Sequence, residues 1–324
     1  DHLQESEGRQ PPVTARSIRS TTLWDHLNHH GKRQVVLNMP VTYPPTPING
    51  IVVSGLLTPP TKRIVAEPAS FGAKVLDKIP DYTADVEWQS YAGQPDAFMD
   101  AIDRMTTGCS TLALLALEQV PDFDLFQVVF VGPDRLQHCM WRYLEPEIWR
   151  EPVDLATRLR ERVYSHFEQL DHHLGQLITA IGSDVPVLVL SDHGFTGVRK
   201  QFIVNRWLAS QNLLRYRTSP TSDLLRRVGS IRWVQSIGRR YFRERAIAMH
   251  ANVTANAIDW SQTQAYCPLQ GENCAISINL QGREPQGIVP PAAYSRLRHQ
   301  VREALTHARD PETDTPLVGK VYFR

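Results

Sequence analysis

The feature that most constrains the fold is a long amphipathic segment, from about Val153 to Ile181, that lies between two short apolar runs. The runs are QVVFV at 127–131 and VPVLVL at 185–190. A strand, a helix and a second strand of these lengths predict a βαβ unit with parallel strands and a right-handed crossover. The apolar residues of the helix recur every three or four positions and form one stripe: Leu155, Leu159, Val163, Phe167, Leu170, Leu174 and Leu177.

The same alternation of helix and strand patterns extends along most of the chain. It predicts a single α/β domain over residues 1–324, built as a three-layer α/β/α sandwich with a mixed, mostly parallel sheet. The Pro-rich stretch MPVTYPPTPING should be irregular, because its prolines fix φ and remove donors. Residues 61–95 show no clear pattern. The other expected elements are helices at 22–30, 96–119 and 292–307 and strands at 34–37, 51–53, 275–280 and 318–323.

An Arg-rich segment interrupts this pattern, and we interpret it as a helical cap inserted near residues 210–260. Residues 215–245 hold nine arginines and two acids, Asp223 and Glu244. Three interpretations remain open. The segment could be a solvated amphipathic cap, a cap whose field draws anionic substrates, or an interfacial helix resting on anionic lipid.

Charge and cysteine content exclude some classes of protein. Lys plus Arg number 35 and Asp plus Glu 34, so a general binder of nucleic-acid polymers, which has a broad basic bias, is not expected. No stretch approaches the roughly 20 apolar residues of a membrane helix. Four cysteines in 324 residues do not resemble a disulfide framework, and we expect buried thiols in a cytoplasmic setting. The sequence does not indicate an oligomeric state.

Two Asp-His pairs follow apolar runs. Asp134 and His138 come after QVVFVGP, and Asp192 and His193 come after VPVLVLS. Ligands of open parallel sheets bind beyond the carboxyl ends of the strands, and oxygen plus imidazole donors suit zinc, or manganese where carboxylates dominate. Each pair alone could be a helix cap or a chance match. Together they predict a two-metal site, with the two carboxylates within about 8 Å of each other.

The strings that carry these pairs are similar to a known family. FVGPDRLQHCMW, VLVLSDHGF, DWSQTQAY and INLQGREPQGIV resemble the alkaline phosphatase superfamily, and within it the type I phosphodiesterase/nucleotide pyrophosphatase-like branch. TYPPTPINGIVVSG and NRWL also resemble that branch, so the similarity extends from about Thr22 to the end.

The resemblance implies residue roles. Asp134 and His138 match the pair that binds one metal ion, and Asp192 and His193 match the pair that binds the other. The ions would be zinc, with manganese as the alternative. The implied Asp-Gly ligand, Thr or Ser nucleophile and final His have no counterpart that we identify, so we expect a domain incomplete at both ends. The nucleophile would lie upstream, no residue of this chain would be catalytic, and the chain itself would be inactive.

The activity implied is metal-dependent hydrolysis of phosphodiesters or nucleotide pyrophosphates, with a phosphorylated small molecule or nucleotide as substrate. A phosphomutase, a sulfatase or a non-catalytic binding relative are the alternatives. Asp171, His172 and His173 fall inside the long helix and are expected to be structural or exposed. Asn205, Arg206 and Arg283 follow shared motifs and are weak candidates to line a pocket.

Overall fold

The computed structural model describes residues 13–217, 258–268 and 275–323. Residue contacts divide the chain into an amino-terminal unit within residues 11–199 and a carboxy-terminal unit that includes residues 200–324. The single domain over 1–324 stays a prediction, and residues 218–257 of the expected cap lie outside the described residues.

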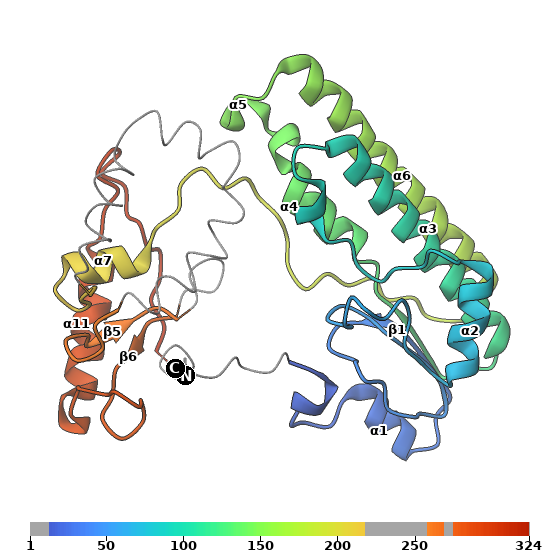
Figure 1. Ribbon diagram of the computed structural model, residues 1–324, viewed down its shortest axis with the longest axis horizontal. Helices are drawn as coiled ribbons and strands as arrows, with labels where there is room; N and C mark the ends of the chain where they lie inside the picture. Colours follow the sequence, from blue (N-terminus) through green and yellow to red (C-terminus); the bar gives the residue numbers. More distant parts are fainter. Residues whose placement is uncertain (1–12, 218–257, 269–274, 324) are drawn as a thin grey trace. The chain divides into compact units, whose positions relative to one another are not determined.

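The amino-terminal unit is a mixed α/β structure (Figure 1). Its sheet has the order β3-β2-β1-β4, in which β1 pairs in parallel with β2 and β4, and β2 pairs antiparallel with β3. The expected mixed, mostly parallel sheet is therefore confirmed. The elements are η1 Ala15–Ser17, α1 Leu23–His29, β1 Gln34–Met39, β2 Gly50–Ser54, β3 Ala66–Glu67, α2 Ala69–Lys78, η2 Trp88–Tyr91, α3 Pro95–Gln119, β4 Leu125–Val128, α4 Gly132–Leu144, α5 Pro146–Trp149 and α6 Val153–Ile181.

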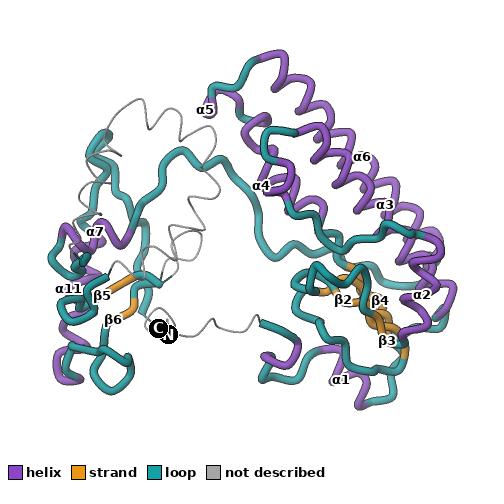
Figure 2. Tube along the Cα trace, in the orientation of Figure 1, coloured by secondary structure: helices purple, strands orange, loops and turns teal. Residues whose placement is uncertain are grey.

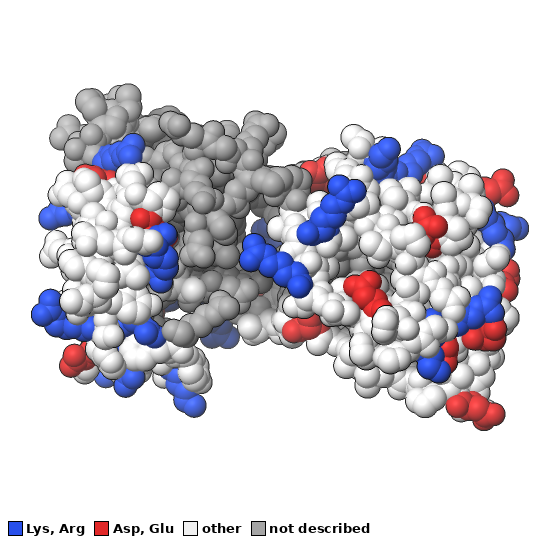
Figure 3. Space-filling view, turned by 90° about the horizontal axis from the view of Figure 1, so that it is seen from below, with Lys and Arg blue, Asp and Glu red and all other residues white. Residues whose placement is uncertain are grey.

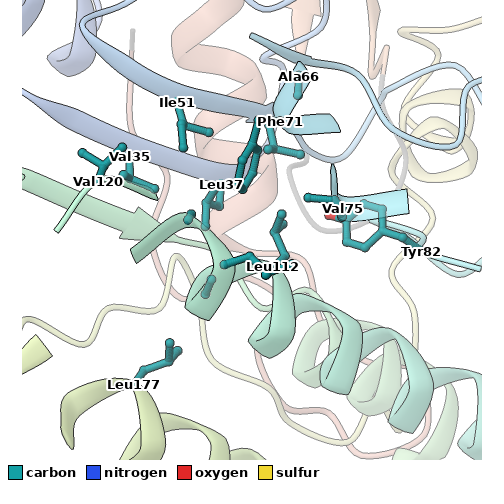
Figure 4. Packing of buried hydrophobic residues seen from close by; sticks show 14 residues of the cluster. Val35, Leu37, Ile51, Ala66, Phe71, Val75, Tyr82, Leu112, Val120 and Leu177 are labelled. Carbon is teal, nitrogen blue, oxygen red and sulfur yellow. The ribbon is translucent and has the colours of Figure 1, made fainter. Parts of the chain in front are cut away.

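Helices cover both faces of this sheet, because alternate strand residues point to opposite faces. Val35 and Leu37 of β1 pack with Phe71 of α2 and Leu112 of α3 on one face (Figure 4). On the other face lies α1, where the Gln34 side chain donates a hydrogen bond of 3.0 Å to the carbonyl oxygen of Trp24 (Figure 1). This layering agrees with the expected α/β/α arrangement.

The long helices match the sequence prediction closely. The stripe on α6 buries Leu159, Val163 and Leu177, and α3 runs unbroken through Thr106–Gly108. Figure 2 shows α3 and α6 side by side, in agreement with their extensive contact. The Pro-rich residues after β1 are irregular, as predicted. Within 61–95, where no pattern was found, the chain forms β3, α2 and η2.

The predicted strand at 185–190 is wrong, and with it the predicted βαβ crossover. These residues have no regular structure and pair with no described strand, so β4 is a terminal strand of its sheet. Val187, Leu188, Val189 and Leu190 are between 51% and 79% exposed. Apolar composition favours a strand only where a neighbour satisfies its backbone N–H and C=O groups, and here none does.

The carboxy-terminal unit has its own core, formed by α7 Val204–Ser210, β5 Ala265–Tyr266, β6 Ser277–Ile278, η3 Pro291–Ala293 and α11 Tyr294–Thr306. The helix predicted at 292–307 is confirmed as α11. The strand predicted at 275–280 is confirmed only in part as β6, and the strand predicted at 318–323 is wrong, because those residues pair with no described strand.

Surface charge in the amino-terminal unit is mixed, and Lys, Arg, Asp and Glu side chains alternate over its visible face (Figure 3). No helix in the described ranges is both long and apolar enough to cross a membrane.

Candidate metal centre

Helix α4 places the first Asp-His pair at the carboxyl end of β4. Gly132 and Pro133 begin the helix, and Asp134 lies in its first turn, where a carboxylate interacts favourably with the helix dipole. His138 follows one turn later, with its Nε2 3.4 Å from Asp134 Oδ1. The Asp134 and His138 side chains are 33% and 39% exposed, so both are accessible to an ion. This arrangement is the one predicted from the DxxxH spacing.

Arg135 fixes the orientation of Asp134. Its Nη1 donates to Asp134 Oδ2 at 3.2 Å, while its Nε and Nη2 donate to the two carboxylate oxygens of Asp85 at 2.6 and 3.0 Å. The hydrogen bonds to Asp85 raise the pKa of Arg135 further, so the guanidinium stays charged. Because Arg135 occupies Oδ2 of Asp134, the other oxygen, Oδ1, is left to face the imidazoles.

His193 approaches the same oxygen atom from the irregular segment that follows α6. Its Nε2 lies 3.6 Å from Asp134 Oδ1 and 3.9 Å from Asp192 Oδ2, and Asp192 is 89% exposed. Since both distances of 3.6 and 3.9 Å start from one nitrogen, the two carboxylate oxygens are at most about 7.5 Å apart, which suits two ions roughly 4 Å apart. The expected proximity of the two pairs is met.

A tight turn presents the second pair. Ser191 Oγ donates to the His193 carbonyl oxygen at 2.6 Å, and the His193 N–H donates to Asp192 Oδ1 at 3.1 Å. The Asp192 and His193 side chains lie near each other, with His193 Nε2 3.9 Å from Asp192 Oδ2. The strand that was expected to precede Ser191 does not form.

The donor chemistry fits a divalent ion, but the donors do not surround a common centre. Donors bound to one tetrahedral ion at about 2.0–2.1 Å are roughly 3.3 Å apart, close to the 3.4 and 3.6 Å that separate Asp134 Oδ1 from the two imidazole nitrogens. Nevertheless, no group of three or more His, Cys, Asp or Glu side chains among the described residues could hold an ion as it stands. The ligand roles of Asp134, His138, Asp192 and His193 stay predictions.

Of the other residues singled out in the sequence, three belong to a long helix and two form hydrogen bonds with backbone groups. Asp171, His172 and His173 lie inside α6, as expected. Asn205 is buried in the carboxy-terminal unit, where its amide forms hydrogen bonds of 3.0 and 2.7 Å with the Cys267 backbone. Arg283 donates to the Ile278 carbonyl oxygen at 2.6 Å. Asn205 and Arg283 thus support the core of their unit.

Sequence reasoning missed Arg135, Asp85 and Phe195. The Phe195 ring lies 4.8 Å from the His138 ring and 5.0 Å from the His193 ring, measured between centroids. Arg135 and Phe195 directly adjoin or closely follow predicted ligands, and that adjacency was an available signal. Asp85 had none, because it lies 50 positions from Arg135 in the chain.

Comparison with models of protein families identifies the family to which the chain belongs. The model of the type I phosphodiesterase/nucleotide pyrophosphatase family matches residues 3–324. The chain belongs to that family. It is thereby a member of the alkaline phosphatase superfamily, as its motifs indicated. No curated protein and no solved structure matches the chain.

Membership in the type I phosphodiesterase/nucleotide pyrophosphatase family sets the class of chemistry. The family consists of phosphoesterases that act on phosphorylated small molecules or nucleotides, and its members generally use divalent metal ions. The clustering of Asp134, His138 and His193 at the carboxyl edge of the sheet is where such a site is expected in an open α/β fold.

Proposed function

We propose that the chain forms the metal-binding part of a hydrolase of phosphodiesters or nucleotide pyrophosphates. The observation that carries this proposal is the Asp134 carboxylate, whose Oδ1 faces two imidazoles from separate parts of the chain at 3.4 and 3.6 Å. Imidazole and carboxylate groups are donors that zinc takes in proteins, and these three side chains are 33% to 43% exposed, so an ion can reach them.

In this proposal Asp134 and His138 hold one divalent ion, and Asp192 and His193 hold the other. Bound ions would neutralise the charge that develops on the attacking and leaving oxygens during displacement at phosphorus. Arg135 keeps Asp134 in a fixed rotamer and thereby sets the direction of its free oxygen. Zinc is the proposed ion, because two of the four donors are imidazoles, and manganese is the alternative.

The nucleophile is proposed to be a Thr or Ser upstream of Asp1, as the family resemblance implies. The residues of this chain then bind and orient the ions and do not attack phosphorus. Without that upstream residue, the 324-residue chain should bind metal ions but should not turn over a diester.

The test compares the chain with a longer protein that includes the sequence encoded on either side of it. Hydrolysis of bis(4-nitrophenyl) phosphate is followed in Zn²⁺ or Mn²⁺, with 4-nitrophenyl phosphate and 4-nitrophenyl sulfate as the monoester and sulfate substrates. The longer protein should cleave the diester fastest, and His138→Ala or Asp192→Asn should abolish that activity. Preferred cleavage of the sulfate ester, or full activity in His138→Ala, would contradict the proposal.

A further inference from the structure

Phe195 is in contact with both imidazoles of the candidate metal centre. Its ring centroid lies 4.8 Å from that of His138, edge to face, and 5.0 Å from that of His193 in a tilted arrangement. A third neighbour, Trp141, stacks on Phe195 with centroids 6.1 Å apart and planes at 22°. The two imidazole centroids are themselves 6.4 Å apart. One ring thus joins two candidate ligands that belong to different parts of the fold.

These contacts belong to a longer strip along α4. Asp134, His138 and Trp141 recur every three or four residues, so they lie on one face of the helix, and Glu145 is the C-cap residue that follows it. The segment 193–197 follows this face in the same direction. His193 is beside Asp134, Phe195 is beside His138 and Trp141, and Gly197 is beside Trp141 and Glu145.

Gly197 lies at the end of the strip, beside Trp141 and Glu145. A Cβ on Gly197 would lie 3.3 Å from Trp141 Nε1 and would overlap the Glu145 carboxylate. The segment is therefore close to α4 at Gly197, although the end of the flexible Glu145 side chain could shift to admit a Cβ. Backbone pairing does not hold the segment here, because residues 182–203 have no regular structure. Side-chain contacts with α4 must supply the alignment, and Phe195 makes several of them.

We infer that Phe195 is a positioning residue that docks on Trp141 and holds the His138 and His193 imidazoles at the Asp134 carboxylate. An aromatic edge or face against each imidazole restricts rotation of that ring. An effect of Phe195 on metal affinity rests on the proposed function. The alignment of the three rings is a property of the metal-free chain.

The test measures ring proximity and metal affinity separately in the 324-residue chain. With selectively labelled rings, the metal-free wild-type chain should show nuclear Overhauser contacts from Phe195 to His138 and Trp141, and from His138 to His193. Phe195→Ala should lose the His138–His193 contact, and Phe195→Tyr, which keeps the ring, should retain it. Phe323→Ala, an exposed phenylalanine of the carboxy-terminal unit, is the matched control.

Zinc affinity, measured by competition with a chromophoric chelator, should fall at least about tenfold in Phe195→Ala and stay within about twofold of wild type in Phe195→Tyr and Phe323→Ala. Absence of the Phe195–His138 contact in the wild-type chain would overturn the inference, and so would an unchanged His138–His193 contact in Phe195→Ala. If the wild-type chain binds no Zn²⁺, the proposed function fails, while the metal-free contacts still decide the role of Phe195.

Discussion

The His193 imidazole lies 3.6 Å from the Asp134 carboxylate, although the segment that carries His193 has no regular secondary structure. Asp134 is held by α4 and by Arg135, so this end of the contact is fixed. His193 is held by its own turn and by the Phe195 ring. The candidate centre therefore combines one preorganised pair of proposed ligands with a second pair that side-chain packing positions.

Replacing Arg135 should weaken metal binding without removing a ligand. Arg135→Ala releases Asp134 Oδ2 and removes the arginine partner of the Asp85 carboxylate, so Asp134 gains rotamers that do not face the imidazoles. Outer-shell changes of this kind typically cost about 10–100-fold in metal affinity. Zinc titration against a chelator measures this loss. Arg142→Ala on the same helix, where the arginine pairs with Glu151, should leave affinity unchanged. An equal loss in both variants would contradict the role of Arg135.

The buried His166 of α6 and its partner Asp103 of α3, whose side chain is 26% exposed, should contribute to stability. His166 is 1% exposed and its Nδ1 donates to Asp103 Oδ1 at 2.7 Å. Asp103→Ala leaves that nitrogen without its acceptor, and such a loss costs about 1–3 kcal/mol. Urea unfolding should show this decrease in the free energy of unfolding. Asp100→Ala, which removes an exposed carboxylate from α3, the helix that also carries Asp103, should change the free energy of unfolding by less than about 0.5 kcal/mol. Similar values for the two variants would show that the His166–Asp103 pair contributes nothing specific.

Cys109 should resist alkylation in the folded chain. Burial raises the pKa of its thiol to about 12, only partly offset by a hydrogen bond from Asn38, so almost no thiolate is present at pH 8. Burial also raises the pKa of Tyr82, which donates to the same asparagine. Iodoacetamide labelling with peptide mass spectrometry should find Cys109 unmodified in the native chain and modified in urea. Rapid native labelling would contradict this prediction.

The same pKa shift predicts how stability depends on pH. The folded thiol has the higher pKa, so the unfolded chain loses its proton first as pH rises. The stability that the protonated thiol contributes is complete below about pH 9 and is lost progressively toward pH 12. Unfolding free energies of wild type and Cys109→Ala at pH 7 and pH 10.5 measure it. Between these pH values the free energy of unfolding should decrease more for wild type than for Cys109→Ala. Equal decreases would contradict the assignment of the raised pKa to Cys109.

The sequence was most informative where periodicity was strong. The apolar stripes on α3 and α6 predicted both helices, since each stripe needs a core to bury it. The spacing of Asp134 and His138 predicted their proximity, because one helical turn separates them. Apolar composition misled at 185–190, because the run cannot specify which strand edge would pair with it. The Asp85–Arg135 and Asp103–His166 pairs join distant positions and carry no local pattern.

The measurement that tests the central claim most directly is calorimetric titration of the 324-residue chain with Zn²⁺. Wild type should bind about two ions, and His138→Ala and His193→Ala should each weaken binding by more than about 100-fold at one site, beyond the 10–100-fold typical of outer-shell changes. His172→Ala, which removes an exposed histidine of α6, should bind as wild type does. Binding that is unchanged in both His138→Ala and His193→Ala would contradict the claim that these residues hold the metal ions.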